Sequence, residues 1–292
     1  MLTALGQLWL TGLPIDWPRL HRHEQRAHVV LPTYPFERQR HWVDPPTVPP
    51  VIPPAASVRR PDGPRDVADW FSVPSWRRQP PPRASAASND GQRILVFLDK
   101  FGLGRALATL LAARGNDVIT VTPGVAFART GEASFEVHPA KVSDYVALLA
   151  MLAREERAPR RVVHLWGVEG EAASAVDAAR FERAQESGFL SVLSLSQALA
   201  AQQTAASCDL VLVTSGGQAV RGDEALRPEV ATALGACKVI PQEYPNLRWR
   251  SVDIELPAPG TAALQPLLEQ LLADLLGEVA EPVTAYRGGY RW

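Results

Sequence analysis

The segment LDKFGLGRAL, residues 98–107, places two glycines directly after a run of β-forming residues. A dinucleotide site needs such glycines, because they let the backbone approach a pyrophosphate that is bound by the N–H groups of the following helix. Gly102 and Gly104 match the first two glycines of that pattern, but Leu107 stands in place of the third. Pro123-Gly124, after the next expected strand, offers neither an acid for the ribose nor a cation for a 2′-phosphate. We therefore predict a tight turn that binds no cofactor.

Ser215, in VTSGG, could polarise a carbonyl group at the end of another expected strand. Carbonyl reductases of the short-chain type pair such a serine with a tyrosine about thirteen residues further on and a lysine four residues beyond it. Here those positions hold Pro228 and Thr232. The proton relay is absent, and we predict a reductase-like scaffold without catalysis.

The segment HRHEQRAH brings His21, His23 and His28 close to Glu24. No cysteine or aspartate joins them at a known metal-ligand spacing, so we predict no metal site. The two cysteines, Cys208 and Cys237, fall in segments that are expected to be a buried strand and a buried helix. We interpret both as unreactive core thiols.

Charge and hydropathy narrow the range of partners. The 30 basic and 31 acidic side chains leave a formal charge of -1, so no global field attracts nucleic acid or an anionic membrane. Partners must then be recognised by shape and apolar contact. No apolar run approaches the roughly 20 residues of a membrane span, and the first residues lack the pattern of a signal peptide, which favours the cytoplasm.

The positioning elements alternate between strands and helices from about residue 93 onward. Strands are predicted at 93–99, 117–122, 134–138, 161–167, 209–215 and 248–255, and helices at 103–114, 142–157, 179–203, 228–239 and 262–276. Such alternation is typical of a parallel, doubly wound sheet with flanking helices. We predict an α/β, Rossmann-like core over about 90–280, without internal repeats.

The first 65 residues have a different character. Leu5, Leu8 and Trp9 have helical spacing and indicate one short amphipathic helix, with an apolar face that needs a partner. Between residues 44 and 64, eight of 21 positions are proline, so we predict an extended spacer over 44–65.

Several strings together resemble modular type I polyketide synthases. LGQLWLTGLPIDW (5–17) and LPTYPFERQRHW (31–42) are similar to the end of an acyltransferase domain and the linker that follows it. WFSVPSW (70–76), VTSGGQAV (213–220), ALGACKVIPQEYPNLRWRSVDIE (233–255) and AYRGGYRW (285–292) are similar to the structural subdomain of a ketoreductase. The resemblance divides the chain into 1–43, acyltransferase end and linker; 44–65, spacer; and 66–292, ketoreductase structural subdomain.

In that family, the structural subdomain is a truncated Rossmann fold that binds no cofactor and braces a catalytic subdomain. The resemblance implies that NADPH and the catalytic residues belong to the ketoreductase catalytic subdomain, outside this sequence. It also implies that the linker docks on the ketosynthase–acyltransferase body, and that an acyl carrier protein is an indirect partner. An excised piece and a split polypeptide both remain open, as do a free-standing NAD(P)-dependent reductase and a scaffold for another inserted domain.

Two sets of residues are candidates for contacts between domains. Pro32 and Pro35 favour an extended strap, and the predicted docking contacts are Tyr34, Pro35, Phe36 and Trp42. The family resemblance places a second set at the interface with the catalytic subdomain: Trp76, Tyr286, Tyr290 and Trp292.

Overall fold

The computed structural model describes residues 2–25, 28–35, 71, 75–84, 91–170, 177–202, 207–257, 264–278 and 281–292. The chain divides into two compact units, Met1–Trp70 and Phe71–Trp292. The predicted proline-rich spacer lies outside the described residues.

The first unit contains two short helices, α1 (Leu2–Leu10) and α2 (Trp17–His21). Asp16 caps α2, because its carboxylate accepts the backbone N–H of Arg19 at 3.0 Å. The rings of Trp9 and Trp17 meet edge to face with centroids 6.1 Å apart. Neither helix has a buried residue, so this part of the chain presents apolar side chains without a core of its own.

A nine-stranded sheet organises the second unit, with the order β11-β10-β8-β7-β6-β2-β3-β5-β4. Its parallel strands are β2 (Arg93–Phe97), β3 (Asp117–Pro123), β5 (Ser134–Val137), β6 (Arg161–Gly167), β7 (Cys208–Ser215), β8 (Leu247–Ile254) and β10 (Val283–Arg287). The antiparallel edge strands are β4 (Ala128–Arg129) and β11 (Tyr290–Arg291). The strand order reverses between β2 and β6, because β3 and β5 lie on one side of β2 while β6, β7 and β8 lie on the other, as in the dinucleotide-binding folds.

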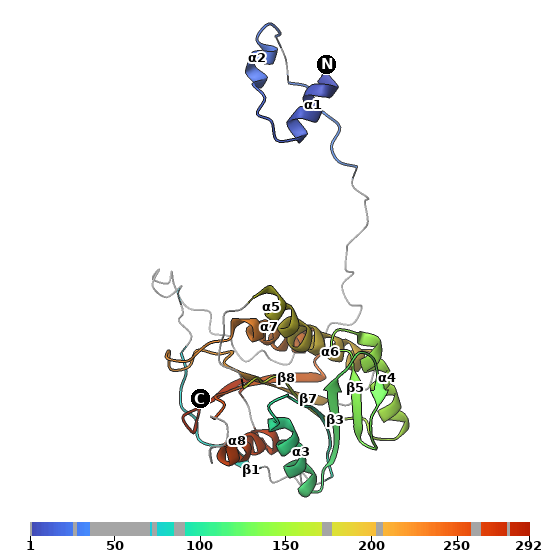
Figure 1. Ribbon diagram of the computed structural model, residues 1–292, viewed down its shortest axis with the longest axis vertical. Coiled ribbons are helices and arrows are strands. Elements are labelled where there is room, and N and C mark those ends of the chain that lie inside the picture. The colour runs from blue at the N-terminus through green and yellow to red at the C-terminus, as the bar shows by residue number, and fades with distance from the viewer. Residues whose placement is uncertain are drawn as a thin grey trace, which may run out of the picture. The chain divides into compact units, whose positions relative to one another are not determined.

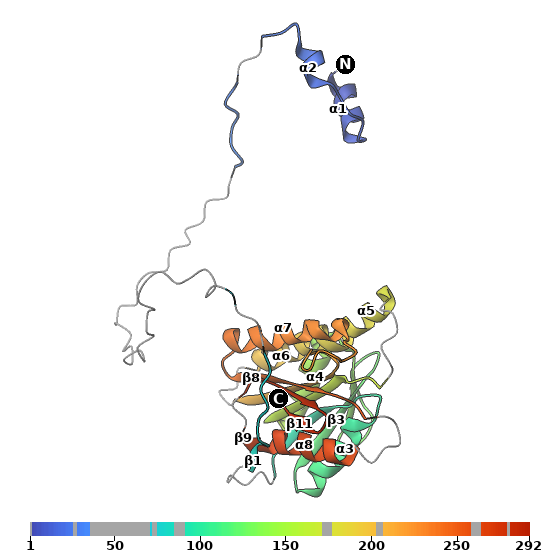
Figure 2. The same cartoon turned by 90° about the vertical axis from the view of Figure 1, so that its left-hand side faces the viewer.

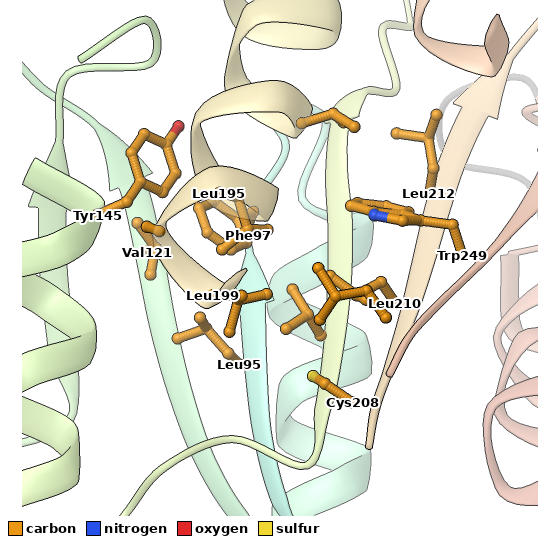
Figure 3. Close-up of a cluster of buried hydrophobic side chains, with 14 of the residues drawn as sticks. Leu95, Phe97, Val121, Tyr145, Leu195, Leu199, Cys208, Leu210, Leu212 and Trp249 are labelled. Atoms are coloured by element: carbon orange, nitrogen blue, oxygen red, sulfur yellow. The ribbon is translucent and has the colours of Figure 1, made fainter. Parts of the chain in front are cut away.

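Helices cover both faces of the sheet (Figures 1 and 2). One face carries α3 (Leu103–Ala113) and α8 (Leu264–Leu276), and the other carries α4 (Val142–Arg154), α6 (Ser191–Ala201) and α7 (Pro228–Glu243). Each layer encloses its own apolar cluster. Figure 3 shows part of the α4–α6–α7 cluster, where Phe97, Leu195 and Trp249 pack over the sheet. The predicted Rossmann-like α/β fold is confirmed.

The fold is shortened at one crossover. Residues 124–133 join β3 to β5 with only the short strand β4 and no helix. The face that such a helix would cover is polar, because Thr120 and Ser134 share a hydrogen bond of 3.0 Å between their hydroxyls and both are half-buried. Ile119 and Phe135 point to the opposite, helix-covered face. The alternation of the two strands thus fits the absence of a helix.

The segment predicted as one helix at 179–203 contains a π-helical turn. It consists of α5 (Ala178–Gln185), the turn Glu186–Leu190 and α6. Directly after the turn, the Ser191 hydroxyl lies 2.8 Å from His164 Nε2 and 2.8 Å from the Tyr145 hydroxyl. Because Tyr145 donates its hydrogen to the Pro139 carbonyl, Ser191 donates to Tyr145 and accepts from Nε2 of a neutral His164.

The sheet continues beyond the predicted limit of about residue 280. β10 pairs in parallel with β8 and forms a hairpin with β11. The arm over residues 75–84 lies along this end of the sheet (Figure 2): Gln79 bridges to Arg291, and β1 (Arg83–Ala84) pairs with β9 (Gly277–Glu278). The core of the unit therefore includes the last residues of the sequence.

Candidate functional site at the carboxyl edge of the sheet

The turn between β2 and α3 is closed by its own carboxylate. Asp99 accepts the backbone N–H groups of Gly102 at 2.8 Å, Leu103 at 3.1 Å and Gly104 at 2.5 Å. These are the N–H groups at the start of α3 that would face a phosphate in a dinucleotide site. Here an internal anion uses them, so the positive end of the helix dipole is already compensated.

The glycines of the turn serve this closure. Gly102 adopts a left-handed conformation with φ of 99°, and a Cβ on Gly104 would lie 2.9 Å from Asp99 Oδ1 and 3.3 Å from Leu98 Cα. Leu107, at the third glycine position, is fully buried in the apolar cluster beneath α3 and α8. Gly104 thus allows the approach of a protein carboxylate.

The Ser215 hydroxyl forms hydrogen bonds with other groups of the protein. Its hydroxyl donates to the Glu169 carbonyl at 3.2 Å and accepts the backbone N–H of Glu169 at 3.1 Å. It also accepts from Nη1 of Arg227 at 3.2 Å, and the residue is only 5% exposed. The hydroxyl ties the end of β7 to the segment that follows β6.

Around Ser215, charged side chains are paired with one another. Arg227 donates from Nη2 to Glu169 at 2.6 Å and from Nε to Glu229 at 3.3 Å. Arg180 on α5 also reaches Glu229, at 3.2 Å. This network links α5, the start of α7 and the end of β6.

A second network joins three of the strings on which the family resemblance rests. Asp253 in β8 accepts from the Thr214 hydroxyl at 2.6 Å and from the backbone N–H of Gly217 at 2.9 Å. Arg287 in β10 is hydrogen-bonded to the Asp253 carboxylate and donates to the Gln218 carbonyl at 2.9 Å. Asp253 and Arg287 are each about 1–2% exposed. They fix the loop after β7 against β8 and β10.

Glu224 anchors the same loop. Its carboxylate lies 3.2 Å from Nε of Arg287 and accepts the backbone N–H groups of Val220, Arg221 and Gly222 at 2.8–3.1 Å. Burial alone would raise the pKa of Glu224, but the backbone donors outweigh it and lower the pKa to about 2. This is a second place where a protein carboxylate occupies a set of backbone donors.

A cavity of about 380 Å³ lies over this network, lined by Ser215, Glu224, Arg227, Glu255 and Arg287 among others. The guanidinium groups of Arg227 and Arg287 are held by internal carboxylates. Of the lining residues that the structure describes, none is a tyrosine or a lysine that could form a relay with Ser215. The described lining of the cavity is rich in paired charges.

The predicted interface residues have unequal exposure. Tyr286 does not belong to an exposed patch: it is 3% exposed, and its hydroxyl donates to Asp274 at 2.5 Å because β10 is an internal strand covered by α8. Tyr290 is 54% exposed, while Trp76 and Trp292 are half-buried. The guanidinium of Arg78 lies 3.9 Å from the ring centre of Tyr290 and 5.0 Å from that of Trp292.

The linker prediction is only partly within the described residues. Tyr34 is 74% exposed and Pro35 is exposed, whereas Phe36 and Trp42 lie outside the described residues. In the first unit, His21 lies 3.5 Å from Glu24 and His23 accepts from Arg22 at 2.7 Å. No group of three potential metal ligands occurs among the residues that the structure describes.

Both cysteines are free and buried, and burial raises the pKa of each thiol to about 12. They contribute to the apolar cluster on the α4–α6–α7 face, where Figure 3 shows Cys208. Within the described part of the chain, no helix combines the length and the apolar character needed to cross a membrane.

Residues 92–274, more than half of the chain, match the family described as beta-ketoacyl synthase-like, N-terminal. The chain belongs to this family. The polyketide synthase PksM of Bacillus subtilis is 24% identical over 169 residues, which are 57% of this chain and 4% of that protein. The polyketide synthase GfsA of Streptomyces halstedii is 39% identical over 59 residues, which are 18% of this chain and 1% of that protein.

Two solved structures share the fold of this beta-ketoacyl synthase-like chain. A multidomain structure of a keto acid-selecting NRPS module, with adenylation, ketoreductase and pseudo Asub domains, matches with a TM-score of 0.64 at 24% identity, over 74% of this chain and 17% of that one. An N-terminal ketoreductase from the macrolactin assembly line matches with a TM-score of 0.57 at 16% identity, over 72% and 41%. The resemblance to modular polyketide synthases is confirmed: the chain corresponds to part of a synthase module, with a ketoreductase-like fold.

The sequence identified the turn and Ser215 as candidate sites, but not the protein groups that form hydrogen bonds with them. Asp99 carried a signal, since an aspartate just before a helix start is a common capping residue. Asp253 and Arg287 carried none, because their contact joins strands 34 positions apart along the chain.

Proposed function

We propose that Phe71–Trp292 is a non-catalytic structural unit of a polyketide synthase module that braces a ketoreductase catalytic subdomain. The observation that carries the proposal is the carboxylate of Asp99 on the first N–H groups of α3. A pyrophosphate at this place would meet a fixed negative charge at hydrogen-bonding distance, which costs several kcal/mol in a partly buried site. The unit therefore keeps the scaffold of a reductase while excluding its cofactor.

The hydrogen bonds of the Ser215 hydroxyl support the same proposal. A catalytic serine must present its hydroxyl to a substrate carbonyl. Here the hydroxyl makes three contacts, to the backbone N–H and carbonyl of Glu169 and to Arg227. The chain is proposed to have no enzymatic activity alone; NADPH and the reduction of β-ketoacyl carrier protein intermediates would belong to the catalytic partner.

We assign the contact with that partner to the end of the sheet where the arm meets the last hairpin. Tyr290 and Arg78 are exposed there, and Trp292 is half-buried beside Arg78. Trp76, two residues before Arg78 in the arm, is also half-buried. Stacked aromatic and guanidinium groups are frequent at the centres of protein interfaces. Tyr286 would support this contact indirectly, because its hydrogen bonds to α8 hold β10 in place.

A fluorescence titration with NADPH tests the cofactor part of the proposal. The chain is expected to give no saturable signal, with an active short-chain reductase as the positive control. Saturable micromolar binding would instead favour a free-standing NAD(P)-dependent reductase.

Mixing with a separately expressed ketoreductase catalytic subdomain tests the bracing part. The chain is expected to raise both the thermal stability and the activity of the catalytic partner, and Tyr290→Ala with Arg78→Ala should weaken this effect. Glu182→Gln, an exposed change on α5, serves as the control. Unchanged stability and activity on mixing would leave a scaffold for another inserted domain as the better proposal.

For the first unit, we propose docking of the linker on a ketosynthase–acyltransferase body through Tyr34, Pro35, Phe36 and Trp42. The exposed side chain of Tyr34 and the uncovered apolar side chains of α1 support it. In an intact module, Tyr34→Ala with Phe36→Ala should increase cleavage of the linker by protease, and unchanged resistance would refute the docking contacts.

A further inference from the structure

A groove of about 370 Å³ lies between the arm, α8 and the last hairpin, at the end of the sheet where Figure 2 shows the arm running to β1 beside α8. The apolar part of its lining comes from all three segments: Pro81 and Pro82 from the arm, Pro266 and Ala273 from α8, and Tyr290 from β11. Its volume falls within the roughly 300–1,000 Å³ of pockets that enclose most of a bound group. The groove is therefore large enough to receive a side chain from another molecule.

Hydrogen bonds fix the walls of this groove relative to one another. Gln270 of α8 donates from Nε2 to the Gly289 carbonyl of the hairpin at 2.7 Å. On the arm side, the backbone N–H of Gln79 donates to the Arg291 carbonyl at 2.9 Å. The φ angles of the lining prolines are fixed by their rings. Because the walls are already ordered, filling the groove requires little further loss of conformational freedom from this chain.

The two charged groups of the lining differ in their pairing. Arg291 is paired with Asp274 at 3.2 Å and with Glu281 at 3.3 Å. Glu269 is exposed on α8, where its carboxylate accepts from Gln265 Nε2 at 3.3 Å, and it forms no ion pair with any residue that the structure describes. The lining thus combines apolar walls with one negative charge that has no counter-ion in the described part of the chain.

Such a lining fits a partner surface that offers an apolar side chain next to a cation. Tyr290 belongs both to the groove and to the contact that we assign to the catalytic partner, where the Arg78 guanidinium lies 3.9 Å from its ring centre. The groove therefore continues the surface on which that partner would lie.

We propose that an apolar side chain of the ketoreductase catalytic subdomain fills this groove, and that a lysine or arginine of the same partner pairs with Glu269. The inference rests on the bracing role proposed above, and it specifies the chemistry of that contact. The partner would place an apolar anchor between the arm and α8, and a cation on the exposed side of α8.

The test is a calorimetric titration of the full chain with the separately expressed catalytic subdomain. Ala273→Phe fills the groove and should weaken binding about tenfold or more, because the partner's apolar side chain can then no longer be buried there. Glu269→Lys repels the partner's cation and should weaken binding about threefold at low salt, and less at high salt. Ala179→Phe and Glu182→Lys, exposed on α5, are the matched controls and should leave binding unchanged.

Thermal unfolding of each free variant shows whether it folds as the parent chain does. Because Glu269 is exposed, Glu269→Lys remains a valid test if Ala273→Phe does not fold. If the parent chain binds and a folded groove variant binds equally tightly, the groove inference is wrong and the bracing role stands. Equal losses in the α5 controls would also overturn it. If the parent chain does not bind at all, the bracing role fails and the groove inference fails with it.

Discussion

The backbone nitrogen of Gly104 lies 2.5 Å from Oδ1 of Asp99, while the other oxygen of the same carboxylate bonds Gly102 and Leu103. One side chain thereby satisfies three N–H groups that would otherwise be orphaned at the helix start. Replacing Asp99 should therefore change mainly the stability of the folded chain.

Asp99→Ala should lower the free energy of unfolding by about 1–2 kcal/mol, the usual cost of losing a capping side chain. The methyl group cannot accept the three N–H groups of the turn. Urea unfolding measures the change, and Glu182→Gln on the exposed side of α5 is the control. Equal midpoints for the two variants would show that Asp99 is not needed at the start of α3.

Two glycine-to-alanine changes should shift the free energy of unfolding in opposite directions. At Gly104 the new Cβ would lie 2.9 Å from Asp99 Oδ1 and 3.3 Å from the Leu98 backbone, so we expect a loss of about 1–3 kcal/mol. Gly235, an exposed helical position in α7 with nothing within 4 Å, should gain up to about 1 kcal/mol as alanine. A denaturant midpoint that moves in the same direction for both variants would contradict the close packing at Gly104.

Arg287→Met should cost about 3–5 kcal/mol, because it leaves the buried carboxylates of Asp253 and Glu224 without their cation. Adding Asp253→Asn should cost less than the sum of the single changes, since the two charges depend on each other. The exposed Arg105→Met is the control, with an effect within about 0.5 kcal/mol. Strict additivity in the double-mutant cycle would argue against the network.

Acid should destabilise the protein through His164. Burial lowers the pKa of His164 from 6.5 to about 3. Between these two pH values, His164 is therefore protonated in the unfolded chain and neutral in the folded chain. The stabilisation is complete above pH 6.5 and is lost as the pH falls toward 3. Between pH 6.5 and 4.5 the loss should amount to about 2 kcal/mol.

His164→Gln keeps a donor for Ser191 but does not titrate, so its stability should change little over that range. Below pH 4.5 both proteins should lose stability, because Glu224, with its pKa lowered to about 2, must then be protonated on unfolding. Chemical denaturation at a series of pH values measures this. A parallel decline of the two proteins between pH 6.5 and 4.5 would exclude His164 as the source.

The strands and helices of the second unit could be predicted because each carries a regular apolar pattern. β6 is almost continuously apolar, as expected for a central strand covered on both faces, whereas β3 alternates. The π-helical turn before Ser191 could not be predicted, since it adds one residue to a turn without a change in composition. The strands at 283–287 and 290–291 were missed because YRGGYR reads as an aromatic turn, and their pairing is with distant segments.

The site was predictable only where neighbours in sequence are neighbours in space. The glycine turn and the missing tyrosine–lysine pair could be read from local spacing. The aromatic residues near the end were treated as one surface, but β10 turns Tyr286 inward and leaves Tyr290 outside. This distinction depends on the alternation of a strand that the sequence did not reveal.

The pairing of Gln79 with Arg291 places the arm at the start of the second unit beside the last hairpin. Protein units with adjacent ends can be inserted into a longer chain without stretching the parts to which they are joined. Any polypeptide joined after Trp292 would therefore begin next to the arm that leads into the sheet. Such a unit is suited to exchange between assemblies by recombination, because its removal would change the local path of the chain very little.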